Sequence, residues 1–142
     1  LSLHDALPIL ERVDSTLLSD LIHKGVVPVM APLTHDGQGN MLNTNADTIA
    51  GETAKALSAI FDVTLVYCFE KKGVLRDEND DESVIPQINH AEFQRYIAEG
   101  IIQEGMIPKL ENSFEAINAG VSEVVITLAS AIHTDGGTRI KK

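Results

Sequence analysis

Three short and continuously apolar runs constrain the fold of this chain more than any other feature of its sequence. They occupy residues 26–33 (VVPVMAPL), 63–69 (VTLVYCF) and 122–129 (SEVVITLA). Runs of this kind are typical of strands that are buried on both faces of a sheet. Helical segments alternate with them in the order α-β-α-β-α-α-β. This order predicts an α/β fold in which helices cover both faces of a mainly parallel sheet.

Apolar residues that recur with helical spacing mark the helical segments. These segments span 10–25, 45–61, 90–102 and 108–120. Gly25 and Gly120 suit helix ends, and the turn-forming stretch 34–40 (THDGQGN) follows the first apolar run. No internal repeat or low-complexity linker divides the chain, so we expect one domain or part of one.

Composition narrows the classes of partner. The 142 residues carry a formal net charge of −10 and no stripe of basic residues, so neither a nucleic-acid surface nor an anionic-membrane surface is expected. No stretch approaches the roughly 18 consecutive apolar residues that a membrane span needs. The single cysteine, Cys68, can form neither an internal disulfide nor a cysteine-based zinc site. We therefore expect a cytoplasmic protein.

The stretch 43–48 (NTNADT) is the first candidate for a functional site. It places the side chains of Asn43, Asn45 and Asp47 at alternate positions before and within the start of a helix. One of them would be enough to cap the helix. Because loops at the carboxyl ends of strands bind ligands in α/β folds, the others could hold a polar substrate or orient a cation. Capping alone is the alternative.

Lys109 is the second candidate. Gly105 and Pro108 mark a helix start and place this lysine in the first turn. A cation there opposes the helix dipole and costs about 0.3–1 kcal/mol if nothing compensates. A bound phosphate would reverse that sign, because the lysine and the backbone N–H groups would share one anion. The alternative is an exposed lysine whose charge is screened by solvent.

Three further places are either ligand loops or plain surface. Residues 70–73 (EKKG) directly follow a buried strand, where ligand loops usually lie, although a charged turn is the alternative. The acidic run 76–83 (RDENDDES) is predicted to be a solvated loop, because it lacks the turn glycine and the final glutamate of a calcium-binding loop. His35 and His133 lie in turn-rich segments and are predicted to belong to surface turns.

Five stretches at this order and spacing resemble the acetylglutamate kinases of the amino-acid kinase superfamily. The matching stretches are 25–33 (GVVPVMAPL), 43–51 (NTNADTIAG), 73–75 (GVL), 104–121 (EGMIPKLENSFEAINAGV) and 137–140 (GTRI). The resemblance extends over nearly all of residues 10–140. It implies the C-terminal, nucleotide-binding half of a three-layer α-β-α sandwich with a mainly parallel sheet.

The resemblance also implies an activity and the residues that perform it. The activity is transfer of the γ-phosphoryl group of ATP, with Mg²⁺, to the side-chain carboxylate of an N-acylglutamate such as N-acetyl-L-glutamate, in arginine biosynthesis. Asn43 matches the substrate-binding asparagine of the family, Asp47 the aspartate that holds the catalytic lysines, and Lys109 the lysine that stabilises charge on the transferring group. The positions that match the nucleotide-binding segments are Glu70, Lys71, Lys72, Gly73, Val74, Leu75, Ile101, Ile102 and Gln103. The complete protein is expected to be a homo-oligomer.

Departures from the family pattern leave other functions open. The loop at 69–73 reads FEKKG where the family has Thr/Ser-Asp-Val-x-Gly, so nucleotide contacts could differ there. A non-catalytic nucleotide-binding homologue, another amino-acid kinase and an interaction domain without a ligand are the alternatives.

The opening stretch 1–9 (LSLHDALPI) fits neither a signal peptide nor a capped helix. The codons CTT TCC CTA CAC GAC GCT CTT CCG ATC would encode it, and this string lies within a common short-read sequencing adaptor. We therefore expect residues 1–9 to be translated adaptor and residues 10–142 to be the C-terminal ATP-binding part of the kinase domain. The family's first catalytic lysine, glycine-rich substrate loop and substrate-binding arginine have no counterpart here, so the chain alone is expected to be inactive.

Overall fold

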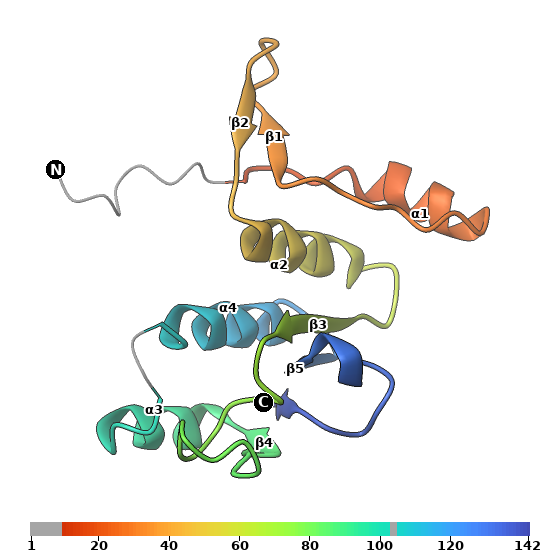
Figure 1. Cartoon of the computed structure of the whole chain (residues 1–142). Helices are drawn as coiled ribbons and strands as arrows, with labels where there is room; N and C mark the ends of the chain where they lie inside the picture. Colours follow the sequence, from red (N-terminus) through yellow and green to blue (C-terminus); the bar gives the residue numbers. More distant parts are fainter. Residues whose placement is uncertain (1–9, 103–104) are drawn as a thin grey trace, which may run out of the picture.

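The computed structural model describes residues 10–102 and 105–142 (Figure 1). The interpretation of residues 1–9 as adaptor and the nucleotide-binding role predicted for Gln103 concern residues outside these ranges. The helices are α1 (Ser15–His23), α2 (Ala46–Leu57), α3 (His90–Ala98), α4 (Ile107–Asn118) and the short 3₁₀ helix η2 (Ala129–Ala131). The strands are β1 (Leu33–His35), β2 (Met41–Asn43), β3 (Thr64–Phe69), β4 (Gln87–Ile88), β5 (Glu123–Leu128) and β6 (Thr138–Ile140).

Four of the described strands form one sheet in the order β3-β5-β6-β4. β3 and β5 are parallel along their whole length, with Thr64 opposite Glu123 and Phe69 opposite Leu128. β4 and β6 are also parallel, whereas β5 and β6 are antiparallel. The predicted α/β fold with a mainly parallel sheet is therefore confirmed.

The core lies between this sheet and two helices. α2 packs against α4 and β3, and α4 packs against β5 and β6 (Figure 1). β3 contributes Leu65 and Tyr67 to the core, β5 contributes Val124 and Ile126, and α4 contributes Leu110. Burying a large apolar side chain stabilises a fold by about 1.5–3 kcal/mol. This packing places the first turns of α2 and α4 next to each other.

The first helix begins later than its sequence pattern predicts. It starts at Ser15 rather than at residue 10, because the carboxylate of Asp14 accepts the backbone N–H of Leu17 at 3.0 Å and caps the helix there. Leu18 is buried, but Leu17 is 56% exposed. The other three predicted helices are present with ends shifted by a few residues.

The predicted buried strand over 26–33 is wrong for most of its length. Only Leu33 belongs to a strand, β1, which pairs with β2 around the predicted turn. Val27 is 83% exposed and Val29 is 94% exposed. A strand exists only by pairing with another strand, and no described strand pairs with residues 26–32. The apolar run therefore forms no strand over residues 26–32 and is largely exposed.

β3 is buried on one face only. Leu65 and Tyr67 point into the core, whereas Val66 is 37% exposed and Cys68 is also exposed. The prediction that the 63–69 run is buried on both faces is therefore wrong here, because the described residues leave the second face of β3 open. β5 lies between β3 and β6, and its four central residues are buried, as predicted.

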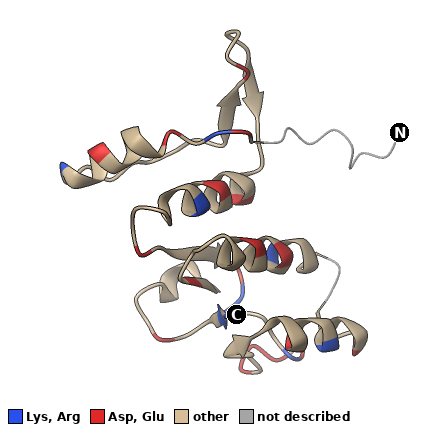
Figure 2. Ribbon diagram, turned by 180° about the vertical axis from the view of Figure 1, so that it is seen from behind, with Lys and Arg blue, Asp and Glu red and all other residues tan. Residues whose placement is uncertain are grey.

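Charged residues are spread over the surface without a basic stripe. In the part of the chain that the structure describes, Lys and Arg are scattered singly or in pairs among more numerous acidic residues (Figure 2). None of the described helices combines the length and the apolar character needed to cross a membrane.

Candidate functional site

The start of α2 assigns different roles to polar side chains that are close in sequence. Asn45 caps the helix, because its Oδ1 accepts the N–H groups of Asp47 at 2.8 Å and Thr48 at 3.3 Å. Capping thus accounts for Asn45 and leaves the carboxylate of Asp47 available for another contact. Asn43 lies at the exposed end of β2. Its substrate-binding role stays a prediction.

Asp47 forms an ion pair with Lys109, which lies in the first turn of α4. The distance from Lys109 Nζ to Asp47 Oδ2 is 2.6 Å. The lysine side chain is 15% exposed, against 41% for the aspartate side chain. The alternative of a solvent-screened surface lysine is therefore wrong. The fold brings together two of the predicted catalytic residues from helices that lie far apart in sequence.

The amino end of α4 can accept an anion. The N-cap residue Met106 makes no side-chain capping hydrogen bond, and Pro108 lies in the first turn. The first N–H groups of a helix have no partner within the helix, and the helix dipole favours negative charge at this end. With Lys109 in the same turn, this helix end has the donors and the charge that a phosphoryl group requires.

Tyr67 contacts both members of the ion pair and is a site residue that the sequence pattern did not indicate. The Lys109 ammonium lies 4.8 Å from the centroid of the Tyr67 ring, which is a cation–π distance. The Tyr67 hydroxyl donates to the backbone carbonyl of Asp47 at 3.3 Å. Burial, together with the carboxylates of Asp47 and Glu52, raises the pKa of Tyr67 to about 12. The sequence feature that relates to Tyr67 is the glycine at position 51, inside α2. In the structure, a Cβ at Gly51 would lie 3.3 Å from the tyrosine hydroxyl.

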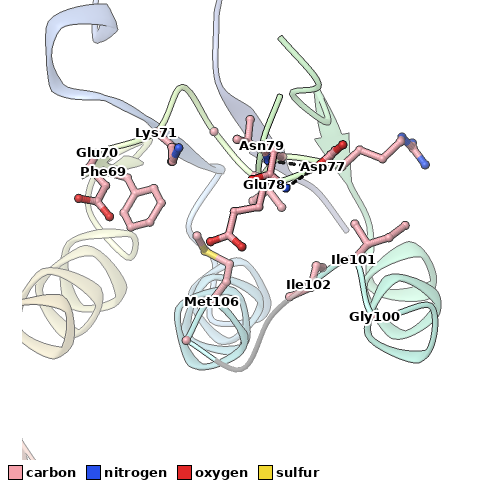
Figure 3. Close-up of a pocket in the computed structure, with 15 residues that line it drawn as sticks. Phe69, Glu70, Lys71, Asp77, Glu78, Asn79, Gly100, Ile101, Ile102 and Met106 are labelled. Atoms are coloured by element: carbon pink, nitrogen blue, oxygen red, sulfur yellow. Dashed lines mark hydrogen bonds between the residues drawn. The ribbon is translucent and has the colours of Figure 1, made fainter. Parts of the chain in front are cut away.

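A cavity of about 720 Å³ lies beside the same end of α4 (Figure 3). Gly105 and Met106 line it, so the cavity begins within one helical turn of Lys109. Its volume lies in the range of about 300–1,000 Å³ that is usual for small-molecule sites. Several residues predicted to bind nucleotide also line it: Glu70, Lys71, Gly73, Val74, Leu75, Ile101 and Ile102.

Lys72 was predicted to bind nucleotide but does not line this cavity. It forms an ion pair with Glu82, and the hydrogen bond from Lys72 to that carboxylate raises the pKa of the lysine. Lys71 lines the cavity and lies 3.2 Å from Asp81. The two adjacent lysines therefore have different surroundings, and only Lys71 is placed to meet a ligand in the cavity.

The acidic run 76–83 is largely exposed, as predicted for a solvated loop, but one end of it also lines the cavity. Asp77, Glu78 and Asn79 do so (Figure 3). The loop is held by its own polar groups, since Asp77 Oδ1 accepts the N–H of Asn79 at 3.0 Å and the Ser83 hydroxyl donates to the carbonyl of Asp77 at 2.9 Å. Acidic runs are typical of exposed surface loops, so nothing in the sequence indicates that this one lies at a site.

A buried threonine fixes the wall of the cavity formed by residues 73–75. Thr138 Oγ1 accepts the N–H of Val74 at 2.8 Å and donates to the carbonyl of Ile85 at 2.7 Å. A Cβ at Gly73 would lie 2.8 Å from the same oxygen, so glycine is required for this close approach. The wall is thereby joined to β6, which carries Thr138.

The charges that line the cavity are mixed. Lys71 and Arg76 contribute positive charge, and Glu70, Asp77 and Glu78 contribute negative charge. Among the residues that the structure describes, no group of three or more His, Cys, Asp or Glu side chains could hold a metal ion.

The two histidines singled out in the sequence lie on the surface. Both His35 and His133 are exposed. His35 Nδ1 accepts the N–H of Gly37 at 3.1 Å within the turn between β1 and β2. The predicted surface position is confirmed for both, but only His133 lies in a turn, because His35 is the last residue of β1.

The comparison with known families agrees with this fold. The model of the amino acid kinase family matches residues 5–128, and the chain belongs to that family. It is 98% identical, over 132 residues, to an acetylglutamate kinase of Bacteroides fragilis, covering 93% of this chain and 51% of that protein. An acetylglutamate kinase of Bacteroides thetaiotaomicron is 85% identical over the same length. The chain spans about half the length of the curated relatives it matches.

Solved structures show the same fold at lower identity. An N-acetylglutamate synthase from Neisseria gonorrhoeae, complexed with coenzyme A and L-arginine, superposes with a TM-score of 0.80 at 21% identity, covering 96% of this chain and 32% of that one. Together with the match to the amino acid kinase family, this likeness confirms the predicted fold.

Proposed function

We propose that the protein to which this chain belongs transfers the γ-phosphoryl group of ATP to the side-chain carboxylate of an N-acylglutamate, with N-acetyl-L-glutamate as the substrate, in arginine biosynthesis. The observation that carries this proposal is the 98% identity with an acetylglutamate kinase. The ion pair of Lys109 and Asp47 at the amino end of α4 supports it, because it offers a held positive charge where a phosphoryl group can bind.

ATP is proposed to occupy the cavity beside α4. Its base would lie against the apolar surface of Ile101, Ile102 and Met106, and its phosphates would point toward the amino end of α4. Lys71 would meet the phosphates from the opposite wall. Mg²⁺ would bind phosphate oxygens and neutralise part of their charge, since this ion is usually held by substrate phosphates and water rather than by an all-protein cage.

In the proposed reaction a carboxylate oxygen of the substrate attacks the γ-phosphorus, and the bond from that phosphorus to the β,γ-bridging oxygen breaks. ADP leaves with the electron pair of the broken bond, and the product is an acyl phosphate. An ionised carboxylate needs no general base, so catalysis consists of positioning and charge stabilisation. Lys109 and the free N–H groups of α4 would stabilise the transferring group, Asp47 would hold the ammonium, and Asn43 would bind the substrate.

The activity belongs to a longer protein than this chain. The chain covers 51% of the acetylglutamate kinase of Bacteroides fragilis. We propose that residues 10–142 are the ATP-binding part of the kinase domain and that they do not phosphorylate N-acetylglutamate alone. The complete protein is proposed to be a cytoplasmic homo-oligomer.

A substrate panel tests the proposal. A protein of full family length that includes this sequence is incubated with ATP, Mg²⁺ and either N-acetyl-L-glutamate, N-succinyl-L-glutamate, glutamate, aspartate or carbamate. Acyl phosphate is trapped with hydroxylamine, and ADP is measured in parallel. We expect product with N-acetyl-L-glutamate and none with free glutamate or aspartate. Product with aspartate or carbamate alone, or ADP without any acyl phosphate, would contradict the proposal.

A further inference from the structure

Tyr67 touches both members of the Lys109–Asp47 pair, yet no step of the proposed reaction uses it. Its side chain comes from β3 and is only 4% exposed. Its ring lies under the Lys109 ammonium at 4.8 Å, and its hydroxyl reaches the backbone of Asp47 at 3.3 Å. One side chain thus joins the central sheet to the first turns of two helices.

We propose that Tyr67 is a positioning residue whose ring holds the Lys109 ammonium at the amino end of α4. The inference rests on the proposed function, because it concerns the same reaction. The ring acts through Lys109 and does not touch the reacting atoms.

The carboxylate of Asp47 is a poor sole anchor for this lysine. Its side chain is 41% exposed, and a full ion pair directs the charge of the ammonium toward Asp47 rather than toward a ligand. An ammonium has three N–H donors. An aromatic face attracts the cation without competing as a full negative charge. The ring therefore fixes the position of Lys109 while at least one N–H remains available for a phosphoryl oxygen.

The tyrosine hydroxyl has a separate and smaller part. It donates to the carbonyl of Asp47 in the first turn of α2, at the long distance of 3.3 Å. Gly51 leaves the space for it, since a Cβ there would lie 3.3 Å from the hydroxyl oxygen. Loss of the hydroxyl alone should therefore disturb the position of Lys109 much less than loss of the ring.

Two substitutions separate ring from hydroxyl. Tyr67→Phe keeps the ring, and Tyr67→Leu replaces it by an apolar side chain that still fills much of the space. Both are made in a protein of full family length that includes this sequence. Phe93→Leu serves as the control for loss of a buried aromatic ring. Phe93 is 1% exposed, and its ring contacts the ring of Phe114 rather than a lysine.

The first readout is steady-state kinetics with N-acetyl-L-glutamate. We expect kcat of Tyr67→Leu to fall by about 5- to 30-fold, the range that corresponds to a desolvated cation–π contact, while KM for ATP changes by less than about twofold. Tyr67→Phe and Phe93→Leu should keep kcat within about twofold of wild type. An unchanged kcat in Tyr67→Leu, or an equal fall in Tyr67→Leu and Tyr67→Phe, would overturn the proposal.

The second readout needs no turnover and separates this inference from the proposed function. In lysine-labelled protein, the ε-methylene resonance of Lys109 should be displaced by the ring current of Tyr67, remain displaced in Tyr67→Phe and return to the ordinary position in Tyr67→Leu. A resonance that is the same in wild type and Tyr67→Leu overturns the positioning role even if the kinase is active. A displaced resonance in a protein that does not phosphorylate N-acetyl-L-glutamate supports the positioning of Lys109 by Tyr67. It overturns only the proposed function.

Discussion

Lys109 occupies a position that its own helix disfavours. A cation in the first turn of a helix costs about 0.3–1 kcal/mol. The contact of 2.6 Å with Asp47 and the ring of Tyr67 offset that cost. A charged residue that is kept against local preference and held by two distant side chains is typical of a functional site.

The environment of Tyr67 makes stability depend on pH in a defined direction. The pKa of Tyr67 is raised from 10.0 to about 12, so the folded state binds this proton more tightly than the unfolded state. The stabilisation is fully present below pH 10 and is lost as pH rises toward 12. We expect the difference in free energy of unfolding between wild type and Tyr67→Phe to decrease over this interval in denaturant titrations at fixed pH. A constant difference would contradict the assigned environment.

Local rules predict some of these residues and not others. A polar cap at the start of α2 and Lys109 in a first turn follow from short sequence patterns, although the choice of Asn45 as the cap does not. The pairing of Asp47 with a lysine follows from the family resemblance. The part played by Tyr67 could not be predicted, because it depends on which face of β3 meets α2 and α4. Such contacts join residues far apart in sequence, and the pattern of an apolar strand does not encode them.

The cavity wall formed by residues 73–75 depends on strand β6. Thr138 is fully buried, and its hydroxyl joins Val74 to Ile85. Neither the short strand β6 nor β4 shows a pattern in the sequence that distinguishes it from a loop, since each has at most three residues. The helices were predictable because their apolar faces repeat over several turns, as in α4 with Leu110, Phe114 and Ile117.

Replacing Thr138 tests whether its hydroxyl holds Val74 and Ile85 in place. Thr138→Val leaves the N–H of Val74 and the carbonyl of Ile85 buried without their partner, which costs about 1–3 kcal/mol of unfolding free energy. ATP affinity should weaken as well, whereas Thr138→Ser should retain most of both. Thr64→Val, on the exposed face of β3, is the control and should change stability by no more than about 0.5 kcal/mol. Equal effects of Thr138→Val and Thr64→Val in thermal unfolding and ATP titration would exclude this role of the Thr138 hydroxyl.

Residues 26–32 form an apolar segment that no described part of the chain covers. The sequence predicts a buried strand there because the segment is continuously apolar. The pairing that would bury it is not encoded in the segment itself, and no described strand provides it. An uncovered apolar segment of this kind is a template for association between chains.

We therefore expect the 142-residue chain to associate through this segment. The double substitution Val27→Thr/Val29→Thr should lower the apparent mass in light scattering at matched concentration, because both side chains are more than four-fifths exposed at 83% and 94%. Ile132→Thr removes a single exposed apolar side chain, 42% exposed, from another part of the surface and should leave association unchanged. Association that persists in the double variant and disappears in Ile132→Thr would place the contact elsewhere.

In the proposed reaction Lys109, held by Asp47, stabilises the phosphoryl group as it is transferred to N-acetyl-L-glutamate. The most informative measurement is kcat of Lys109→Met in a protein of full family length, beside Lys55→Met, which removes a half-buried lysine that pairs with Glu52 within α2. Loss of a group that stabilises developing charge is expected to lower kcat by about 10²- to 10³-fold, with the control within about twofold of wild type. Wild-type kcat in Lys109→Met, or an equal loss in Lys55→Met, would contradict the claim.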